Sequence, residues 1–236
     1  MGYLTAHGYR LMQEFGAFDR IQLESEGLLT AKGCEDTQNV TIYSDFDQRT
    51  RETGKALAAG LFPDCNVPVQ ALPEGVEDPL FHPVQAGVGG SDPDLASAAI
   101  AGRIGTDPAN LTKIYNAKLK ALDTILATCG KADRIAQART SLLDVPSGIS
   151  RGKNDRSVDL RGPLNTASTL TENLLLEYPE GMPASDVGWG CVDGNKLRSR
   201  LELHTAASDF SQRTTPIARR RLQICWIIFF FRWARP

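Results

Sequence analysis

The sequence lacks the patterns that mark a metal site, a membrane span or a secretion signal. Its five cysteines include no Cys-x-x-Cys pair and no Cys/His spacing, which argues against a zinc site. The apolar stretch Ile224–Phe231 is far shorter than the roughly 20 residues that a bilayer requires. Met1–Thr5 does not combine a basic region with an apolar run, so no signal peptide is predicted. We expect no metal and no membrane partner.

An excess of charge of either sign is also missing. The chain has 26 Lys and Arg against 28 Asp and Glu, a net charge of −2, which indicates no nucleic-acid partner. The exception is residues 217–236, which hold five arginines and no acid. Nothing in the sequence indicates an oligomeric state.

The first part of the chain has the pattern of an α/β sheet. Residues 4–18 favour a helix with Thr5 as its N-cap. Val40–Tyr43 is rich in β-branched residues and predicts a strand, and a helix then runs from about Gln48 to Leu61. Val67–Gln70 predicts a second strand at a sheet edge. The order strand–helix–strand is typical of an α/β unit.

The second part is predicted to be mostly helical. Helices are expected at 93–105, 111–128, 163–178 and 194–212, with irregular structure at 71–92 and 143–160. In the second of these helices Ile114 shares the predicted buried face with Leu122 and Ile125. The fold class is therefore α/β with a mostly helical cap. The predicted domains are 1–85, 86–215 and a separate tail, 216–236.

The tail does not follow either pattern. Trp226–Phe231 shows no amphipathic period and would be an exposed apolar patch or an aggregation-prone strand. We interpret 216–236 as an aberrant end, such as an out-of-frame product. The alternative, a genuine core strand, stays open.

The stretch Ser44–Gly54 carries the most chemistry. It lies where the predicted strand meets the N-terminus of a helix, a place where α/β proteins bind anions. Arg49 falls in the first helical turn, where its guanidinium can contact two phosphate oxygens. The residues alone also allow a plainer reading, in which Arg49 and Arg51 are surface residues paired with Asp45, Asp47 or Glu52.

Several blocks of the sequence resemble the histidine acid phosphatases of the bacterial phytase and glucose-1-phosphatase type. They are Gly2–Thr5, Gly27–Leu29, Lys32–Cys34, Asp45–Gly54, Ala58–Leu61, Pro63–Cys65, Asp78–Val84, Leu170–Leu176, Gly188–Gly190, Leu203–His204, Gln212–Thr214 and Ala218–Arg221. The resemblance implies part of a phosphoglycerate-mutase-like α/β sandwich with a helical cap. It also implies hydrolysis of phosphomonoesters, such as inositol or sugar phosphates, through a phosphohistidine without a cofactor. The family location would be periplasmic.

The resemblance assigns roles to five residues. Arg49 matches a phosphate-binding arginine and is the candidate catalytic residue. Asp45, Glu172, His204 and Arg221 match substrate-binding positions, although Thr205 stands where the family has asparagine after the matched histidine.

Two catalytic motifs of the family do not occur in these 236 residues. They are the nucleophile motif Arg-His-Gly-x-Arg-x-Pro and the His-Asp pair of the general acid. We therefore expect an inactive fragment, truncated at both ends, cytoplasmic as written if the missing signal is genuine. One alternative is a minimal enzyme that uses His7, within Ala6–Arg10. Others are a non-catalytic anion-binding remnant and a non-functional product of a disrupted gene.

The cysteines allow several arrangements. In an oxidising compartment Cys34 and Cys65 are the best local pair, and the alternative is that all five thiols are reduced and buried. The resemblance implies the Cys34–Cys65 disulfide. It also implies that Cys129 is unpaired here, because its family partner would lie beyond the matched region. His82, in a proline-bounded loop, is expected to be structural.

Overall fold

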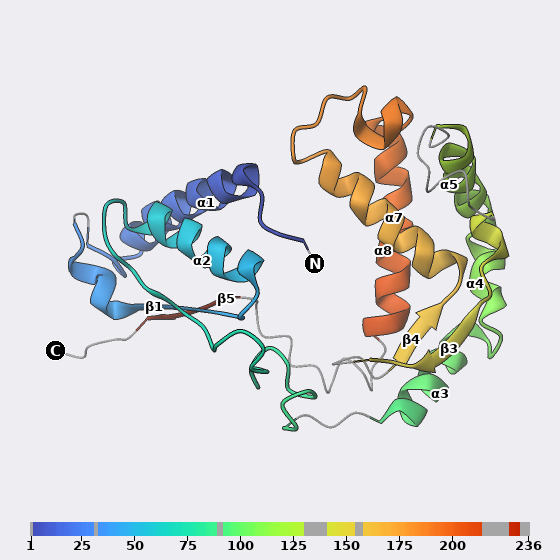
Figure 1. Ribbon diagram of the computed structural model, residues 1–236, viewed down its shortest axis with the longest axis horizontal. Helices are drawn as coiled ribbons and strands as arrows, with labels where there is room; N and C mark the ends of the chain where they lie inside the picture. Colours follow the sequence, from blue (N-terminus) through green and yellow to red (C-terminus); the bar gives the residue numbers. More distant parts are fainter. Residues whose placement is uncertain are drawn as a thin grey trace. The chain divides into compact units, whose positions relative to one another are not determined.

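The computed structural model of the protein describes residues 2–30, 33–88, 92–129, 141–153, 158–213 and 227–231 (Figure 1). The chain forms two compact units: Met1–Gly89 with Gln223–Pro236, and Gly90–Leu222. They are called the first and second units below. Each has a buried hydrophobic core of its own.

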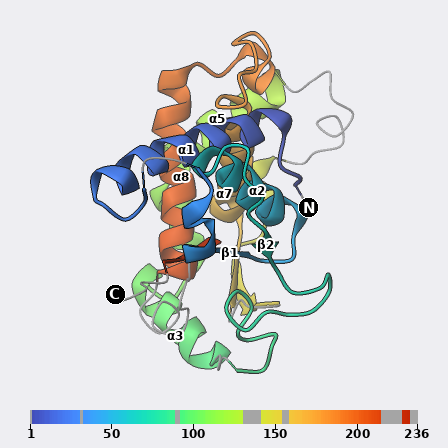
Figure 2. The same ribbon diagram turned by 90° about the vertical axis from the view of Figure 1, so that its left-hand side faces the viewer.

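The first unit is a small sheet covered by two helices. Its elements are α1 (Ala6–Ser25), the 3₁₀-helix η1 (Glu35–Asn39), β1 (Val40–Ser44), α2 (Gln48–Leu61), β2 (Val69–Gln70) and β5 (Ile227–Phe231). The strand order is β2-β1-β5, with β2 parallel and β5 antiparallel to β1. Strands β1 and β2 are labelled next to each other in Figure 2. This architecture confirms the predicted α/β class.

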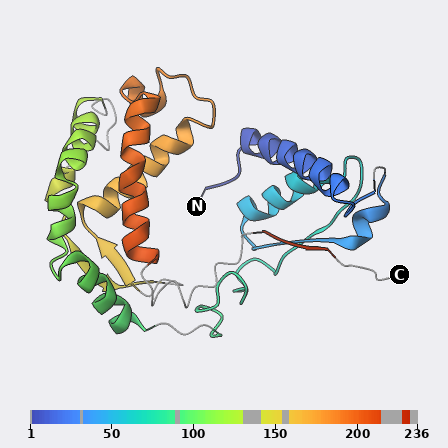
Figure 3. The same cartoon turned by 180° about the vertical axis from the view of Figure 1, so that it is seen from behind.

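Helices α1 and α2 lie side by side on one face of this sheet (Figures 1 and 3). The Thr5 hydroxyl accepts a hydrogen bond from the Gly8 N–H at 2.9 Å, as expected of an N-cap. The two helices touch through their backbones, because a Cβ added at Gly60 would overlap the Gln13 carbonyl oxygen. Helix α2 in turn packs on Ile42, which is completely buried.

The predicted tail contains a strand. β5 pairs with the whole of β1, with Ile42 opposite Phe229. This pairing gives residues 227–231 the conformation of a β-strand, and the origin of the tail stays a prediction. The rest of the predicted tail, including Arg221 and Cys225, lies outside the described residues.

The second unit is mostly helical, with one β-hairpin. Its elements are α3 (Pro93–Ile104), α4 (Ala109–Ile114), α5 (Asn116–Thr128), η3 (Leu142–Asp144), β3 (Gly148–Arg151), β4 (Val158–Arg161), α7 (Pro163–Glu177), η4 (Val187–Gly190) and α8 (Gly194–Gln212). Helices α7 and α8 lie against each other (Figure 3). Leu119, Leu122, Leu142 and Leu203 are fully buried in the core.

Two sequence predictions for this unit were wrong. The segment 143–160 was expected to be irregular, but β3 and β4 form an antiparallel hairpin in it, with Ile149 opposite Leu160. The helix predicted over 111–128 is interrupted at Tyr115, which ends α4 and precedes α5. The interruption shifts the helical phase, so Ile114 is 67% exposed instead of sharing the buried face.

Two disulfides cross-link the chain. Cys34 is bonded to Cys65, the pair that the resemblance implied. Cys129 is bonded to Cys191, so the expectation of an unpaired Cys129 was wrong. The cause is tertiary: Cys129, the C-cap of α5, has its Cα 6.3 Å from that of Cys191, which follows η4.

Candidate functional site

The β1–α2 junction places Arg49 at the start of a helix. Strand β1 ends at Ser44, and Asp47 is the N-cap of α2, although its side chain makes no capping hydrogen bond. The Thr50 hydroxyl lies 2.9 Å from the Asp45 carbonyl oxygen and 2.8 Å from that of Asp47, which ties the loop to the first helical turn. The first-turn N–H groups carry the positive end of the helix dipole.

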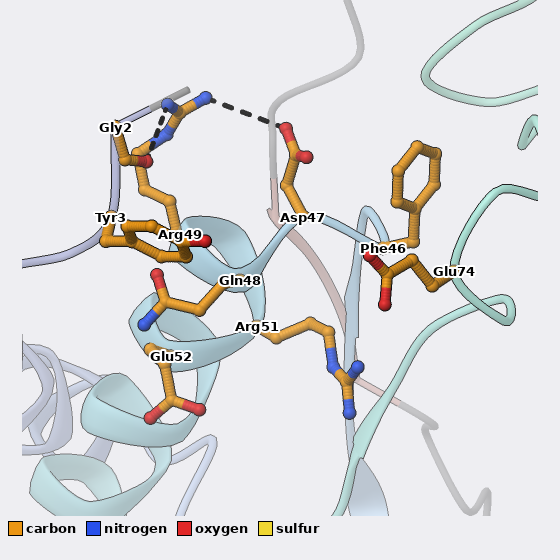
Figure 4. Close-up of a pocket in the computed structure, with 9 residues that line it drawn as sticks. All are labelled: Gly2, Tyr3, Phe46, Asp47, Gln48, Arg49, Arg51, Glu52 and Glu74. Carbon is orange, nitrogen blue, oxygen red and sulfur yellow. Dashed lines mark hydrogen bonds and ion pairs between the residues drawn. The ribbon is translucent and has the colours of Figure 1, made fainter.

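A cavity of about 320 Å³ opens at this junction, within the range expected of small-ligand sites. Its lining belongs to the first unit and is shown in Figure 4: Gly2, Tyr3, Phe46, Asp47, Gln48, Arg49, Arg51, Glu52 and Glu74. Gln48 also fixes the N-terminal segment, because its side-chain oxygen accepts the Leu4 N–H at 3.0 Å. The cavity therefore combines the start of α2 with the segment before α1.

The Arg49 guanidinium lies at the wall of the cavity. Its Nη1 lies 3.5 Å from the Gly2 carbonyl oxygen and its Nη2 lies 4.0 Å from Asp47 Oδ2 (Figure 4). Both distances are at the long limit for such contacts. The side chain is 36% exposed. A guanidinium in this position can form charge-assisted hydrogen bonds with two phosphate oxygens.

The charges around the cavity balance. Asp47, Glu52 and Glu74 oppose Arg49 and Arg51 in the lining. Lys55, whose ammonium lies 2.6 Å from Glu52, supplies a third cation close by. The sequence also allowed Arg49 and Arg51 to be surface residues paired with nearby carboxylates. Arg49 does face Asp47, whereas Glu52 pairs with Lys55. The affinity for an anion then depends on how each nearby carboxylate is compensated.

Asp45 does not line the cavity. It is buried, with 6% of its surface exposed, and its Oδ1 accepts the Phe46 N–H at 2.8 Å. Its Oδ2 lies 2.9 Å from His82 Nε2. Sequence reasoning missed this partner, because 37 residues separate the two and no local pattern joins them.

A second carboxylate attaches the loop 71–88 to β1. The Tyr43 hydroxyl donates a hydrogen bond to Asp78, which is 2% exposed, and the Tyr43 ring stacks on Phe81. Asp78 also accepts the Leu80 N–H at 2.8 Å. Tyr43 lies on β1 and Asp45 directly follows its last residue, so this loop is anchored twice at the strand end that carries the site.

The Tyr43 phenol should ionise at an unusually high pH. The hydrogen bond to Asp78, burial, and the charges of Asp78 and Asp45 raise its pKa from 10.0 to about 12. Because the folded-state pKa lies above the unfolded value, this stabilisation is complete below about pH 10 and is lost as the pH rises toward 12. Spectrophotometric titration of phenolate should show one late component, absent from Tyr43→Phe. A late component that survives the substitution belongs to another tyrosine and contradicts this assignment.

Glu172 and His204 belong to the second unit. Glu172 is exposed on α7, and His204 is half-buried on α8 with its Nδ1 3.1 Å from the Ser168 hydroxyl. The structure places these two in one unit and Arg49 and Asp45 in the other. His7 lies in the first turn of α1 and does not line the cavity.

Across the part of the chain that the structure describes, no cluster of three or more His, Cys, Asp or Glu side chains could hold a metal ion. In the same residues no helix is both long and apolar enough to cross a bilayer.

Comparison with known proteins identifies the family. The profile of the Histidine phosphatase superfamily (branch 2) matches residues 1–132, more than half of the chain. The chain belongs to this superfamily. It is 35% identical to the phytase AppA of Escherichia coli K12 over 94% of its own length and 52% of that protein. It is 30% identical to the glucose-1-phosphatase of Providencia rettgeri over 81% of its length and 45% of that protein.

Solved structures of phytases have the same fold. The apo phytase of Hafnia alvei matches with a TM-score of 0.80 and 35% identity, over 92% of this chain and 53% of that one. The Citrobacter braakii phytase matches with a TM-score of 0.79 and 34% identity, over 93% and 54%. The Hafnia alvei phytase has also been solved with myo-inositol hexakis sulphate. The chain thus spans about half the length of these histidine phosphatases.

Proposed function

We propose that the chain carries the Arg49 part of the substrate site of a histidine-type acid phosphatase. The substrates would be phosphomonoesters such as inositol phosphates or sugar phosphates. Membership of the superfamily supports this, as does the similarity to proteins named phytase and glucose-1-phosphatase. The observation that carries the proposal is an arginine in the first turn of α2, with its guanidinium at the wall of a cavity and its side chain 36% exposed.

We also propose that the 236-residue polypeptide binds such esters but hydrolyses them negligibly. Covalent catalysis through phosphohistidine needs a nucleophilic histidine and a general acid, and neither family motif occurs in the sequence. Arg49 and the helix N-terminus can still stabilise phosphate charge without turnover. Equal background rates on a phosphomonoester for the wild type and His7→Ala would support this proposal, and a rate lost in His7→Ala would reject it.

Binding can be tested directly with inositol hexakisphosphate and isothermal titration calorimetry. Saturable binding is expected for the wild type. Arg49→Ala should weaken it by roughly 10- to 100-fold, the value of one or two hydrogen bonds to a charged group. The affinity of Arg49→Lys should lie between those of the wild type and Arg49→Ala, because an ammonium keeps the charge but cannot bind two phosphate oxygens as a guanidinium does.

Arg10→Ala is the matched control. Arg10 is exposed on α1 and does not line the cavity, so this variant removes the same net charge elsewhere on the first unit. Its affinity should match that of the wild type. If Arg10→Ala and Arg49→Ala lose affinity equally, binding reflects overall charge and the proposed site is wrong.

A further inference from the structure

His82 lies between two carboxylates. Its Nε2 is 2.9 Å from Asp45 Oδ2, and its Nδ1 is 4.0 Å from Glu77 Oε2. The other Glu77 oxygen accepts the Gln85 side-chain N–H at 2.9 Å. Glu77 Oε2 itself is buried without a hydrogen-bond partner among the described residues. The imidazole therefore has an acceptor beside each of its ring nitrogens.

This arrangement determines what each protonation state of His82 can do. An ionised carboxylate only accepts hydrogen bonds, so the His82 Nε2–H donates its hydrogen bond to Asp45 Oδ2. A second proton on Nδ1 would point toward the buried oxygen of Glu77. The protonated ring then faces a carboxylate on either side. With a neutral ring, Glu77 Oε2 has no donor from His82.

The other groups around His82 are already engaged. Its backbone N–H donates to the Asp78 carbonyl oxygen at 2.6 Å, and the Asp78 carboxylate accepts from Tyr43. The centroid of the Phe46 ring lies 6.0 Å from that of the His82 imidazole. The ionisable neighbours of His82 include Asp45 from the β1–α2 loop and Glu77 and Asp78 from its own loop.

Asp45 connects His82 to the cavity. One Asp45 oxygen faces the imidazole while the other accepts the Phe46 N–H. Phe46 and Asp47 then line the cavity together with Arg49. A shift of the Asp45 carboxylate would therefore move the wall that faces a bound anion.

Asp45 also affects the cavity through its charge. It is a buried carboxylate four positions from Arg49, and an anion bound at Arg49 would be repelled by it unless a cation compensates it. Arg49 itself faces Asp47. When its imidazole is protonated, His82 is a cation in contact with Asp45, because its Nε2 lies 2.9 Å from Asp45 Oδ2.

We propose that His82 is a positioning residue of the phosphate site. It holds Asp45 and the Phe46–Asp47 wall in place, and its imidazolium offsets the Asp45 charge so that anions bind more tightly at acidic pH. This inference rests on the proposed function, because it requires an anion at Arg49.

The probe is myo-inositol hexakis sulphate, whose sulphate groups stay fully ionised, so that any pH dependence comes from the protein. Titration calorimetry should show wild-type affinity falling by roughly three- to tenfold between about pH 5 and pH 7. His82→Gln keeps a hydrogen-bond donor without a titrating charge. It should bind as the wild type does at the upper pH and lose most of the pH dependence. His7→Gln, the matched control, should keep the wild-type profile.

A second variant keeps the inference testable if His82→Gln does not fold. Glu77→Gln removes the carboxylate beside Nδ1, so the midpoint of the pH profile should move to lower pH. Intact disulfides and unchanged circular dichroism verify folding. An unchanged profile in a folded His82→Gln or Glu77→Gln protein overturns the role of His82 alone. A wild type without Arg49-dependent binding at either pH overturns the proposed function and this inference with it.

Discussion

Gly60→Ala will separate α1 from α2 and destabilise the first unit. A Cβ at this position would overlap the Gln13 carbonyl oxygen and lie 2.8 Å from the Ala17 nitrogen. Both are backbone atoms of α1, so no side-chain rotation can relieve the contact. We expect a loss of about 3 kcal/mol, at the upper end for overpacking, because the helices must move apart and Leu61 loses its packing.

Hydrogen exchange measured by mass spectrometry can localise this effect. Protection of α1 and α2 should fall in Gly60→Ala, while α7 and α8 in the second unit keep theirs. The control is Gly102→Ala, in the last turn of α3, where a Cβ would meet no atom within 4 Å. That change should be neutral or stabilise by about 0.5–1 kcal/mol, because alanine favours helix. Unchanged protection of α1 in Gly60→Ala would mean that the two helices are not in backbone contact.

Removing the Cys129–Cys191 disulfide should cost the second unit about 4 kcal/mol. The cross-link spans 62 residues, and closing a loop of that length restricts the unfolded chain strongly. The double variant Cys129→Ser, Cys191→Ser should therefore unfold at a markedly lower temperature than the wild type. The Cys34–Cys65 disulfide spans 31 residues of the first unit. Replacing both of its cysteines by serine should therefore mainly destabilise the first unit.

Peptide mapping without reduction tests the pairing itself. We expect one cross-linked peptide that joins Cys129 to Cys191 and another that joins Cys34 to Cys65. A free thiol at Cys129 in the wild type would restore the expectation drawn from the family resemblance. Cys129→Ser alone should instead release a thiol at Cys191.

Local patterns were sufficient wherever neighbouring residues determine the structure. The β-branched run at Val40–Tyr43, the helix that follows and Pro63 after it predicted β1 and α2 to within a residue or two. The hairpin was missed although Val158 and Leu160 are buried and Arg161 is exposed. This alternation is the signal of a strand, but four residues are too short to stand out. The interruption at Tyr115 could not be predicted, because no proline or glycine occurs next to it in the sequence.

By itself, the sequence determined the strand–helix junction and the place of Arg49 in its first turn. Those features depend on backbone propensities and on residues three or four positions apart. Only the tertiary structure decided that His82 contacts Asp45, that Cys129 meets Cys191, and that Ile227–Phe231 pairs with β1. Such pairings join positions far apart in the chain, and they are set by how whole helices and strands pack rather than by any pattern within one of them.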